Sequence, residues 1–102
     1  MPVADELDQL PKEASAHAYQ LLEEIEDKGF DAPRVVFRQI ERKLWEIKMN
    51  LPGAGGFRIF YFTIQGDTLL LLHVYAKKSK KAPKHHVDRA LERMGDAIKR
   101  GL

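Results

Sequence analysis

The chain has 102 residues, of which 44% are hydrophobic and none is cysteine, and its formal net charge at pH 7 is +2. This length suffices for one hydrophobic core, so we expect a single domain over residues 1–102. The composition excludes disulfides, thiolate chemistry and cysteine-ligated zinc, and the longest apolar run is too short to cross a bilayer. Because the first residues include no apolar leader, we expect a cytoplasmic protein.

The charge is strongly divided along the chain. Residues 1–33 carry nine acidic side chains against two lysines, whereas residues 77–102 carry nine basic side chains against three acidic ones. A basic third of this kind is a candidate surface for nucleic acid. Solvated charge without any partner would give the same pattern.

Apolar residues recur at helical spacing in the first part of the chain. Residues 3–10 predict a short helix, and residues 12–28 predict a second one that ends at Gly29 in a left-handed turn. Residues 35–41 are ambiguous, and we interpret them as a helical turn.

The hydrophobic period then changes from helical to alternating. Residues 44–49 predict a half-buried strand, and residues 50–56 predict a loop because they contain proline and three glycines. Residues 57–64 and 68–76 predict two further strands, and the second is so apolar that we expect it to be central in the sheet. After Pro83, one apolar stripe predicts a helix, formed by Val87, Ala90, Leu91, Met94, Ala97 and Ile98.

This order of elements predicts an α+β fold. It consists of amino-terminal helices, an antiparallel meander sheet of three or four strands, and a carboxy-terminal helix. Within it, the sequence FRIFYF places an arginine inside an aromatic strand, and the next strand leads into KKSKKAP. Such cations suit binding of a phosphate backbone and point to RNA.

Several segments together resemble the RelE/ParE toxin superfamily, in particular its HigB-like, phage-derived Gp49 branch. They are KLWEIKM, GGFRIFYF, GDTLLLLHVYAKKSKKAP and VDRALERM, with DELDQLP and LLEEIEDKGF upstream, so that the resemblance spans roughly residues 3 to 98. It implies the toxin of a type II toxin–antitoxin system, a metal-free endoribonuclease that cleaves mRNA on the ribosome and needs no cofactor. The implied partners are mRNA, the ribosome and a cognate helix-turn-helix antitoxin, with no membrane.

The alternative is a protein of the same fold that acts by binding, as gyrase-poisoning relatives do, or that binds nucleic acid or a partner protein. The amino terminus also departs from the family pattern, in which a β-strand usually precedes the first helices. Either the start is truncated, or one edge of the sheet is open to a partner strand.

By the same resemblance, Arg58 is the strand arginine that contacts the scissile phosphate. Its planar guanidinium suits that role, although a structural ion pair with Glu46 across the sheet is the other interpretation. Alternation puts Lys48 on the face of Glu46, opposite Trp45, where it either contacts RNA or simply discourages edge pairing. The chemistry requires the ribose 2′-oxygen to attack phosphorus while side chains move protons and neutralise charge.

Where many relatives carry a tyrosine or histidine, this chain has His85 and His86, each a candidate acid or base because imidazole titrates near neutrality. Exposed polar residues are the alternative for both, and His73 is interpreted as a packed core histidine. The spacing of the four histidines predicts no metal site. The candidate RNA-binding residues are the lysines of the basic block, which could instead be a solubilising loop: Lys77, Lys78, Lys80, Lys81 and Lys84.

Overall fold

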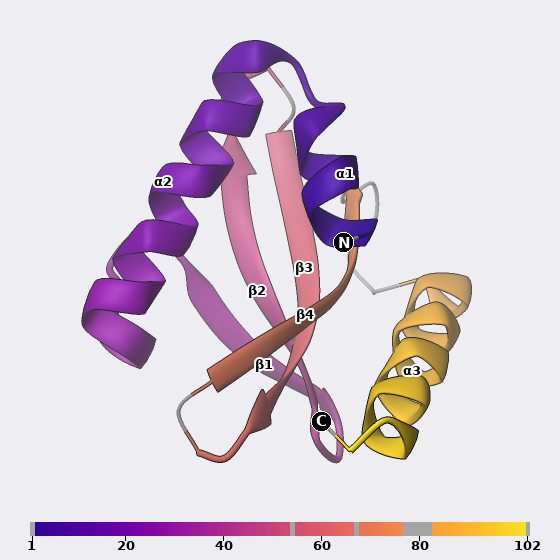
Figure 1. The fold of residues 1–102 in the computed structure, drawn as a ribbon. Coiled ribbons are helices and arrows are strands. Elements are labelled where there is room, and N and C mark those ends of the chain that lie inside the picture. Colours follow the sequence, from indigo (N-terminus) through magenta and orange to yellow (C-terminus); the bar gives the residue numbers. More distant parts are fainter. Residues whose placement is uncertain (1, 54, 67, 77–82, 102) are drawn as a thin grey trace.

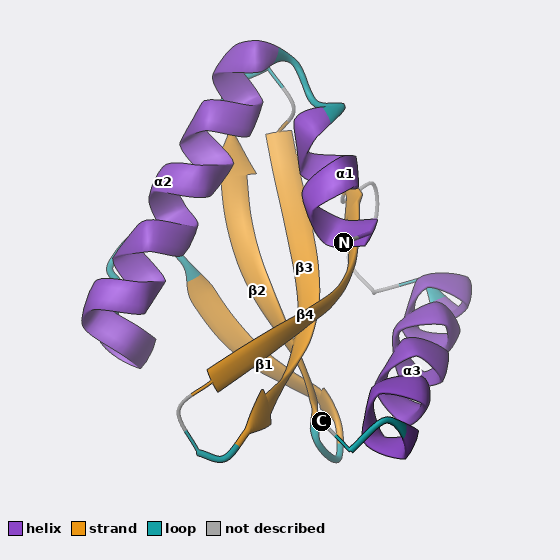
Figure 2. Cartoon of the chain, viewed as in Figure 1, coloured by secondary structure: helices purple, strands orange, loops and turns teal. Residues whose placement is uncertain are grey.

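The computed structural model describes residues 2–53, 55–66, 68–76 and 83–101. The helices on the amino-terminal side are α1 (Pro2–Asp8), α2 (Lys12–Lys28) and the one-turn 3₁₀ helix η1 (Gly29–Asp31). The strands are β1 (Val36–Glu41), β2 (Leu44–Leu51), β3 (Gly55–Ile64) and β4 (Thr68–Ala76), and they precede helix α3 (Lys84–Lys99). The strands form one antiparallel sheet in the order β1-β2-β3-β4 (Figures 1 and 2), which confirms the predicted α+β meander.

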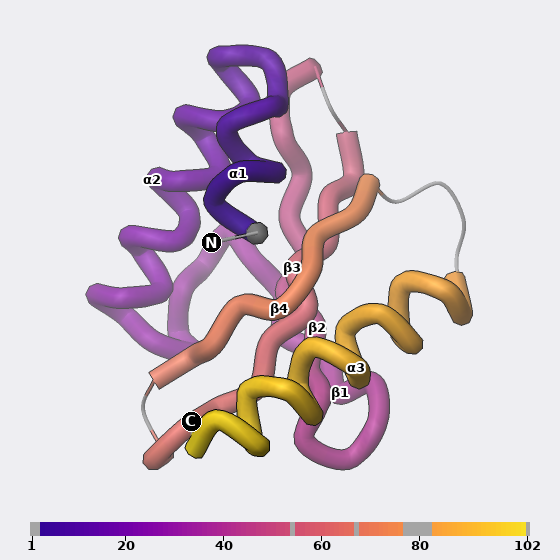
Figure 3. Tube along the Cα trace, turned by 45° about the vertical axis from the view of Figure 1, so that its right-hand side comes forward, coloured from indigo at the N-terminus to yellow at the C-terminus, as the bar shows by residue number. Residues whose placement is uncertain are grey.

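Helices cover both faces of the sheet. Figures 1 and 3 show α1 and α2 on one side of the strands and α3 on the other. The alternation of β2 and β3 divides their side chains accordingly: Ile47 and Ile59 are buried with α1 and α2, and Phe60 is buried with α3. Each such fully buried apolar side chain contributes about 1.5–3 kcal/mol to folding. We call these the α2 face and the α3 face.

The interpretation of residues 35–41 as a helical turn was wrong, because residues 36–41 form β1 and pair with β2. The two strands are joined by Arg42 and Lys43, since Glu41 pairs with Leu44. Arg42 has a positive φ of 50°, and its carbonyl accepts a hydrogen bond of 2.8 Å from the Gln39 side chain. This turn contains no glycine, proline or asparagine, so it carries none of the usual turn signals.

The expected central position of residues 68–76 was also wrong, because β4 lies at an edge of the sheet. Its apolar character has a different cause. Both α1 and α3 contact β4, so its two faces are covered although one of its edges pairs with no strand of the described sheet. The predicted loop over residues 50–56 is shorter than expected, since β2 continues to Leu51 and β3 begins at Gly55.

A β-bulge in β4 changes which side chains share a face. Phe60 pairs with His73 and Tyr61 pairs with Leu71, so Leu72 is an extra residue in the strand. Strict alternation would have placed His73 and Tyr75 on the α2 face with Leu71. With the extra residue, Tyr75 instead joins the apolar cluster of the α3 face.

The helix that ends at Lys28 is followed by Gly29, which has the positive φ expected from the sequence. Its φ of 60° and ψ of −135° differ from the expected left-handed helical turn, in which ψ is also positive. Among the described residues, no helix is both long enough and apolar enough to span a membrane.

Candidate functional site

Polar side chains gather on the α3 face, where β1, β2, β3 and β4 run side by side. Arg38 is the cross-strand partner of Glu46, Lys48 is the partner of Arg58, and Arg58 is in turn the partner of Tyr75. Directly opposed residues in neighbouring antiparallel strands have side chains within contact range. The sheet register therefore brings Lys48 and Arg58 together, as expected, and adds Arg38 beside them.

Glu46 lies at the centre of this group and is fully buried. Its Oε2 accepts a hydrogen bond of 2.9 Å from the Tyr75 hydroxyl, and its Oε1 lies 3.5 Å from Arg38 Nη2 and 3.9 Å from Arg58 Nε. Within the described part of the chain, neither Glu46 Oε1 nor Arg58 Nε has a hydrogen-bond partner. A buried carboxylate is tolerated only when positive charge and donors compensate it, so Glu46 holds both arginines nearby.

Arg58 is placed by its strand and by Glu46. Its Nη1 donates a hydrogen bond of 2.9 Å to the carbonyl of Phe57, and its side chain is 13% exposed. The guanidinium is thus oriented without a bidentate bond to the carboxylate beneath it. Both interpretations from the sequence are compatible with this contact, since the ion pair with Glu46 leaves guanidinium donors for a second anion.

Tyr75 connects the carboxylate to the helix. Its ring stacks on Phe60 at a centroid distance of 5.3 Å and on His86 at 4.5 Å. Burial, followed by the hydrogen bond to Glu46, raises the pKa of Tyr75 above its ordinary value. A buried hydroxyl that already donates to a carboxylate is a poor general base, so Tyr75 acts here by holding Glu46 and His86.

His85 and His86 lie in the first turn of α3, and their rings are 4.1 Å apart. His86 is partly buried against Tyr75, and its Nδ1 lies 2.8 Å from Nε2 of His73. Burial lowers the pKa of His86, and the neighbouring His85 lowers it further.

The position of His73 in an apolar strand predicted a packed core histidine. The structure shows that His73 is not enclosed in the hydrophobic core. The bulge turns it to the α3 face, where it is partly buried and stacks on Phe60. Its Nδ1 lies 3.3 Å from Nη1 of Arg93, and its pKa is lowered to about 4 by burial and then by Arg93 and the other cations and histidines nearby.

Most of the candidate RNA-binding lysines lie outside the residues that the structure describes. Lys84 is exposed at the start of α3, beside the two histidines in sequence. The other four lie outside the described residues: Lys77, Lys78, Lys80 and Lys81. Sequence reasoning did not identify Arg38 or Arg93 as residues of this face. It considered Glu46 only as a possible ion-pair partner of Arg58. Glu46 has only a weak signal in the sequence, because alternation places it between Leu44 and Lys48 on the mixed face of the strand.

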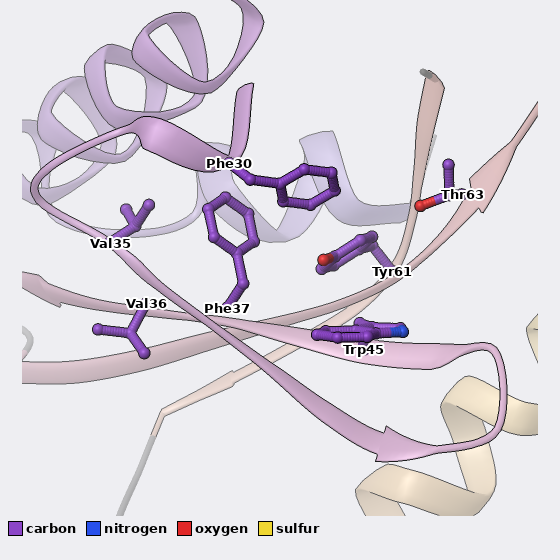
Figure 4. Close-up of a pocket in the computed structure, with 7 residues that line it drawn as sticks. All are labelled: Phe30, Val35, Val36, Phe37, Trp45, Tyr61 and Thr63. Atoms are coloured by element: carbon purple, nitrogen blue, oxygen red, sulfur yellow. The ribbon is translucent and has the colours of Figure 1, made fainter. Parts of the chain in front are cut away.

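The α2 face carries an apolar pocket of about 610 Å³ that the sequence argument did not find. Figure 4 shows four aromatic rings arranged around it, those of Phe30, Phe37, Trp45 and Tyr61. The Phe30 side is open, since that residue is 60% exposed, whereas burial raises the pKa of Tyr61 to about 12. No charged side chain lines this pocket, so it lacks the groups that acid–base or phosphate chemistry requires.

Metal chemistry has no evident place in the described structure. Among residues 2–53, 55–66, 68–76 and 83–101, no group of three or more histidine, aspartate or glutamate side chains is arranged to hold a metal ion. What the α3 face offers is fixed positive charge from arginine and lysine, a buried carboxylate, and three imidazoles. This set can bind a phosphodiester and move protons beside it.

A comparison with protein families gives one match, which covers residues 5–95. The family is described as phage derived protein Gp49-like (DUF891). No curated protein and no solved structure matches the chain significantly. The match covers part of α1, the whole of α2 and the sheet, and most of α3, and hence every residue of the α3 face discussed above.

Proposed function

Because the chain belongs to the phage-derived Gp49-like family, which is associated with RelE/HigB-like toxins, we propose that it is the toxin of a type II toxin–antitoxin pair and that it cleaves mRNA. Ribosome-bound mRNA is the substrate, and a cognate antitoxin with a helix-turn-helix domain is the partner that silences it. The reaction uses no metal and no cofactor.

One observation carries this proposal: the fully buried Glu46 lies within 3.9 Å of Arg58 and 3.5 Å of Arg38 on the face that also holds His86. Burying a carboxylate is costly, and a protein that needed only a stable sheet would gain as much from an apolar residue there. A carboxylate that orients two guanidinium groups has a use when those groups must meet an anion in a fixed geometry. A phosphodiester is such an anion.

In the proposed mechanism, the 2′-oxygen of the ribose attacks the adjacent phosphorus, and the bond from phosphorus to the 5′-oxygen of the next nucleotide breaks. One group accepts the proton of the 2′-hydroxyl, and another delivers a proton to the leaving 5′-oxygen, which leaves a 2′,3′-cyclic phosphate. Arg58 and Lys48 neutralise the charge that develops on the phosphate oxygens. His85 and His86, at the start of α3, take part in hydrogen bonding and proton transfer.

A second function fits the same contacts, namely binding without cleavage. The side chain of Arg58 is only 13% exposed and faces Glu46, which also suits a structural ion pair. On that interpretation the cationic face and the basic block bind a nucleic acid or a protein target, and the histidines have no role in chemistry.

The test compares three chains expressed from an inducible promoter in a bacterial host: the unchanged chain, Arg58→Gln and Arg100→Gln. Arg100 follows the last residue of α3 and is exposed, so its substitution removes the same charge away from the site. The unchanged chain and Arg100→Gln are expected to stop growth and leave cut mRNA, whereas Arg58→Gln does neither. The loss of about 3–4 kcal/mol of transition-state stabilisation corresponds to a rate lower by ~10²–10³.

Thermal unfolding of the purified variants shows whether Arg58→Gln is still folded. Full toxicity of a folded Arg58→Gln chain would contradict the catalytic role of Arg58. Growth arrest by the unchanged chain without any cut RNA, in cells or on purified translating ribosomes, would favour the binding function. On purified RNA that the chain cuts without a ribosome, cleavage that persists with excess EDTA supports the metal-free chemistry, and loss of that cleavage on addition of EDTA would contradict it.

A further inference from the structure

Three side chains from α3 and β4 form a connected series of hydrogen bonds that ends at His86. Arg93 Nη1 lies 3.3 Å from Nδ1 of His73, and Nε2 of His73 lies 2.8 Å from Nδ1 of His86. His73 uses both of its ring nitrogens in this series, and His86 uses one. The direction of each hydrogen bond therefore decides which ring nitrogen carries the proton.

The direction of the hydrogen bonds is fixed at the Arg93 end of the series. A guanidinium has only donors and stays charged at any working pH. Arg93 is held in place, because its Nη1 also donates a bond of 2.8 Å to the carbonyl of Leu72 and lies 3.5 Å from Glu6 of α1. Nδ1 of His73 must therefore accept, which means that it carries no proton.

The proton of His73 is then on its other nitrogen. Burial and the positive charge of Arg93 lower the pKa of His73 to about 4, so the ring is neutral near pH 7 and has one N–H group. With Nδ1 accepting from Arg93, that N–H group is Nε2–H, and it donates to Nδ1 of His86. His86 in turn must leave its Nδ1 unprotonated.

We propose that Arg93, acting through His73, fixes His86 as the neutral tautomer that carries its proton on Nε2. This defines Arg93 and His73 as positioning residues. The consequence for catalysis rests on the proposed function: His86 offers the RNA phosphate an N–H donor at Nε2 and does not take up the 2′-hydroxyl proton at that atom. The tautomer itself follows from the geometry whether or not the chain cleaves RNA.

The opposite arrangement is disfavoured by the Arg93 guanidinium and by the ring protons themselves. If His86 donated from Nδ1, then His73 would have to carry its proton on Nδ1, directly against the Arg93 guanidinium. A doubly protonated His86 would set its Nδ1–H against the Nε2–H of His73. The groups that face His73 are Arg93, Arg89, His85 and His86, and those that face His86 are His73, His85 and the Tyr75 ring, none of which is acidic.

Nitrogen-15 NMR of the full chain labelled in its histidines tests this proposal directly. Long-range proton–nitrogen spectra at pH 7 distinguish a protonated from an unprotonated ring nitrogen. We expect His73 and His86 both to be neutral with the proton on Nε2. A wild-type spectrum with His86 protonated on Nδ1, or charged at pH 7, would overturn the proposal without any variant being needed.

Two arginines of α3 give a matched pair of variants. Arg93→Met removes the donor to His73 and one positive charge, whereas Arg89→Met removes a nearby positive charge but not that hydrogen bond. Arg93→Met is expected to give a mixture of tautomers at His73 and His86, and Arg89→Met is expected to leave the Nε2–H form in place. If a folded Arg93→Met chain kept the same His86 tautomer, Arg93 would not be the residue that fixes it.

Because Arg93→Met also loses the contacts with Leu72 and Glu6, a second variant covers the case in which it does not fold. His73→Phe keeps a ring that can stack on Phe60 but cannot donate to His86. The midpoint of His86 titration is expected to rise, since the N–H group of His73 that opposes a proton on His86 Nδ1 is gone. Failure of that rise contradicts the proposal. If the spectra agree with the proposal and no RNA is cut, the proposed function fails while the tautomer assignment stands.

Discussion

The Tyr75 hydroxyl donates a hydrogen bond of 2.9 Å to the buried Glu46 carboxylate, although the two residues are 29 positions apart in the chain. They meet because of the extra residue Leu72, which shifts the alternation of β4 by one position before Tyr75. Without that bulge Tyr75 would point to the α2 face, and Glu46 Oε2 would lose the hydroxyl that donates to it. The composition of the α3 face thus depends on a local irregularity at a sheet edge.

From this contact we expect Tyr75→Phe to lower the free energy of unfolding by about 1–3 kcal/mol, because a buried carboxylate oxygen loses its donor. The ring stack on Phe60 and His86 can remain, so the loss reports mainly the hydroxyl. Tyr19→Phe is the matched control: its hydroxyl donates a bond of 2.8 Å to Asp8 at the exposed surface, where the same change is expected to cost much less. Urea unfolding at pH 7 measures both, and equal losses would contradict the special role of Glu46.

Much of this face could be predicted from the sequence. The alternation of residues 44–49 placed Glu46 and Lys48 on one side and Trp45 on the other, and the order of elements gave the antiparallel neighbours. Arg58 then follows on the same face, because it pairs with Lys48. The RNA-related roles of these residues remain predictions.

Other parts of the fold had no signal in the sequence. The β1–β2 turn uses Arg42 with positive φ, which most residues adopt only when the surrounding strands compensate the strain. The bulge at Leu72 falls within a run of leucines, whose pattern is the same in either register. For this reason His73 was assigned to the core, when its side chain in fact contacts His86 and Arg93.

The neutral state of His73 predicts a loss of stability in mild acid. Its pKa in the folded chain is lowered to about 4 from an ordinary value of 6.5. The contribution is therefore fully present above pH 6.5 and is lost as the pH falls toward 4, since the unfolded chain binds a proton that the folded chain does not. Because the ring is only partly buried, we expect about 1–2 kcal/mol over this interval.

Urea unfolding at several pH values between 7 and 4 measures this slope. In His73→Phe the slope should be smaller than in the unchanged chain, because position 73 no longer titrates. His17→Gln, in α2, is the control for the loss of a histidine elsewhere and should leave most of the slope in place. If both variants kept the full slope, other groups would account for the acid sensitivity.

The basic block predicts a salt-dependent contact with RNA. Replacing four of its five lysines by alanine should weaken binding to single-stranded RNA or ribosomes. It should also reduce the slope of log Kd against log salt by up to about 0.7 per lost phosphate contact. The residues to change are Lys77, Lys78, Lys80 and Lys81. The control changes four exposed lysines from other segments and so removes the same charge: Lys12, Lys28, Lys43 and Lys99. Equal slopes for the two quadruple variants, measured by fluorescence anisotropy, would mean that net charge and not this block determines binding.

The two histidines at the start of α3 can be separated by the pH dependence of RNA cleavage. If His86 is an N–H donor to the phosphate, His86→Gln keeps a donor, so we expect a rate lower by less than about 10-fold with the pH profile unchanged. His86→Phe keeps a ring against Tyr75 but removes the donor, and its rate should fall by ~10² or more.

His85 is then the imidazole that can accept or deliver a proton, and His85→Gln should lower the rate by ~10² and flatten the profile near neutrality. A flattened profile in His86→Gln with a normal one in His85→Gln would exchange these roles. Normal cleavage by both glutamine variants would place proton transfer on a group outside this pair.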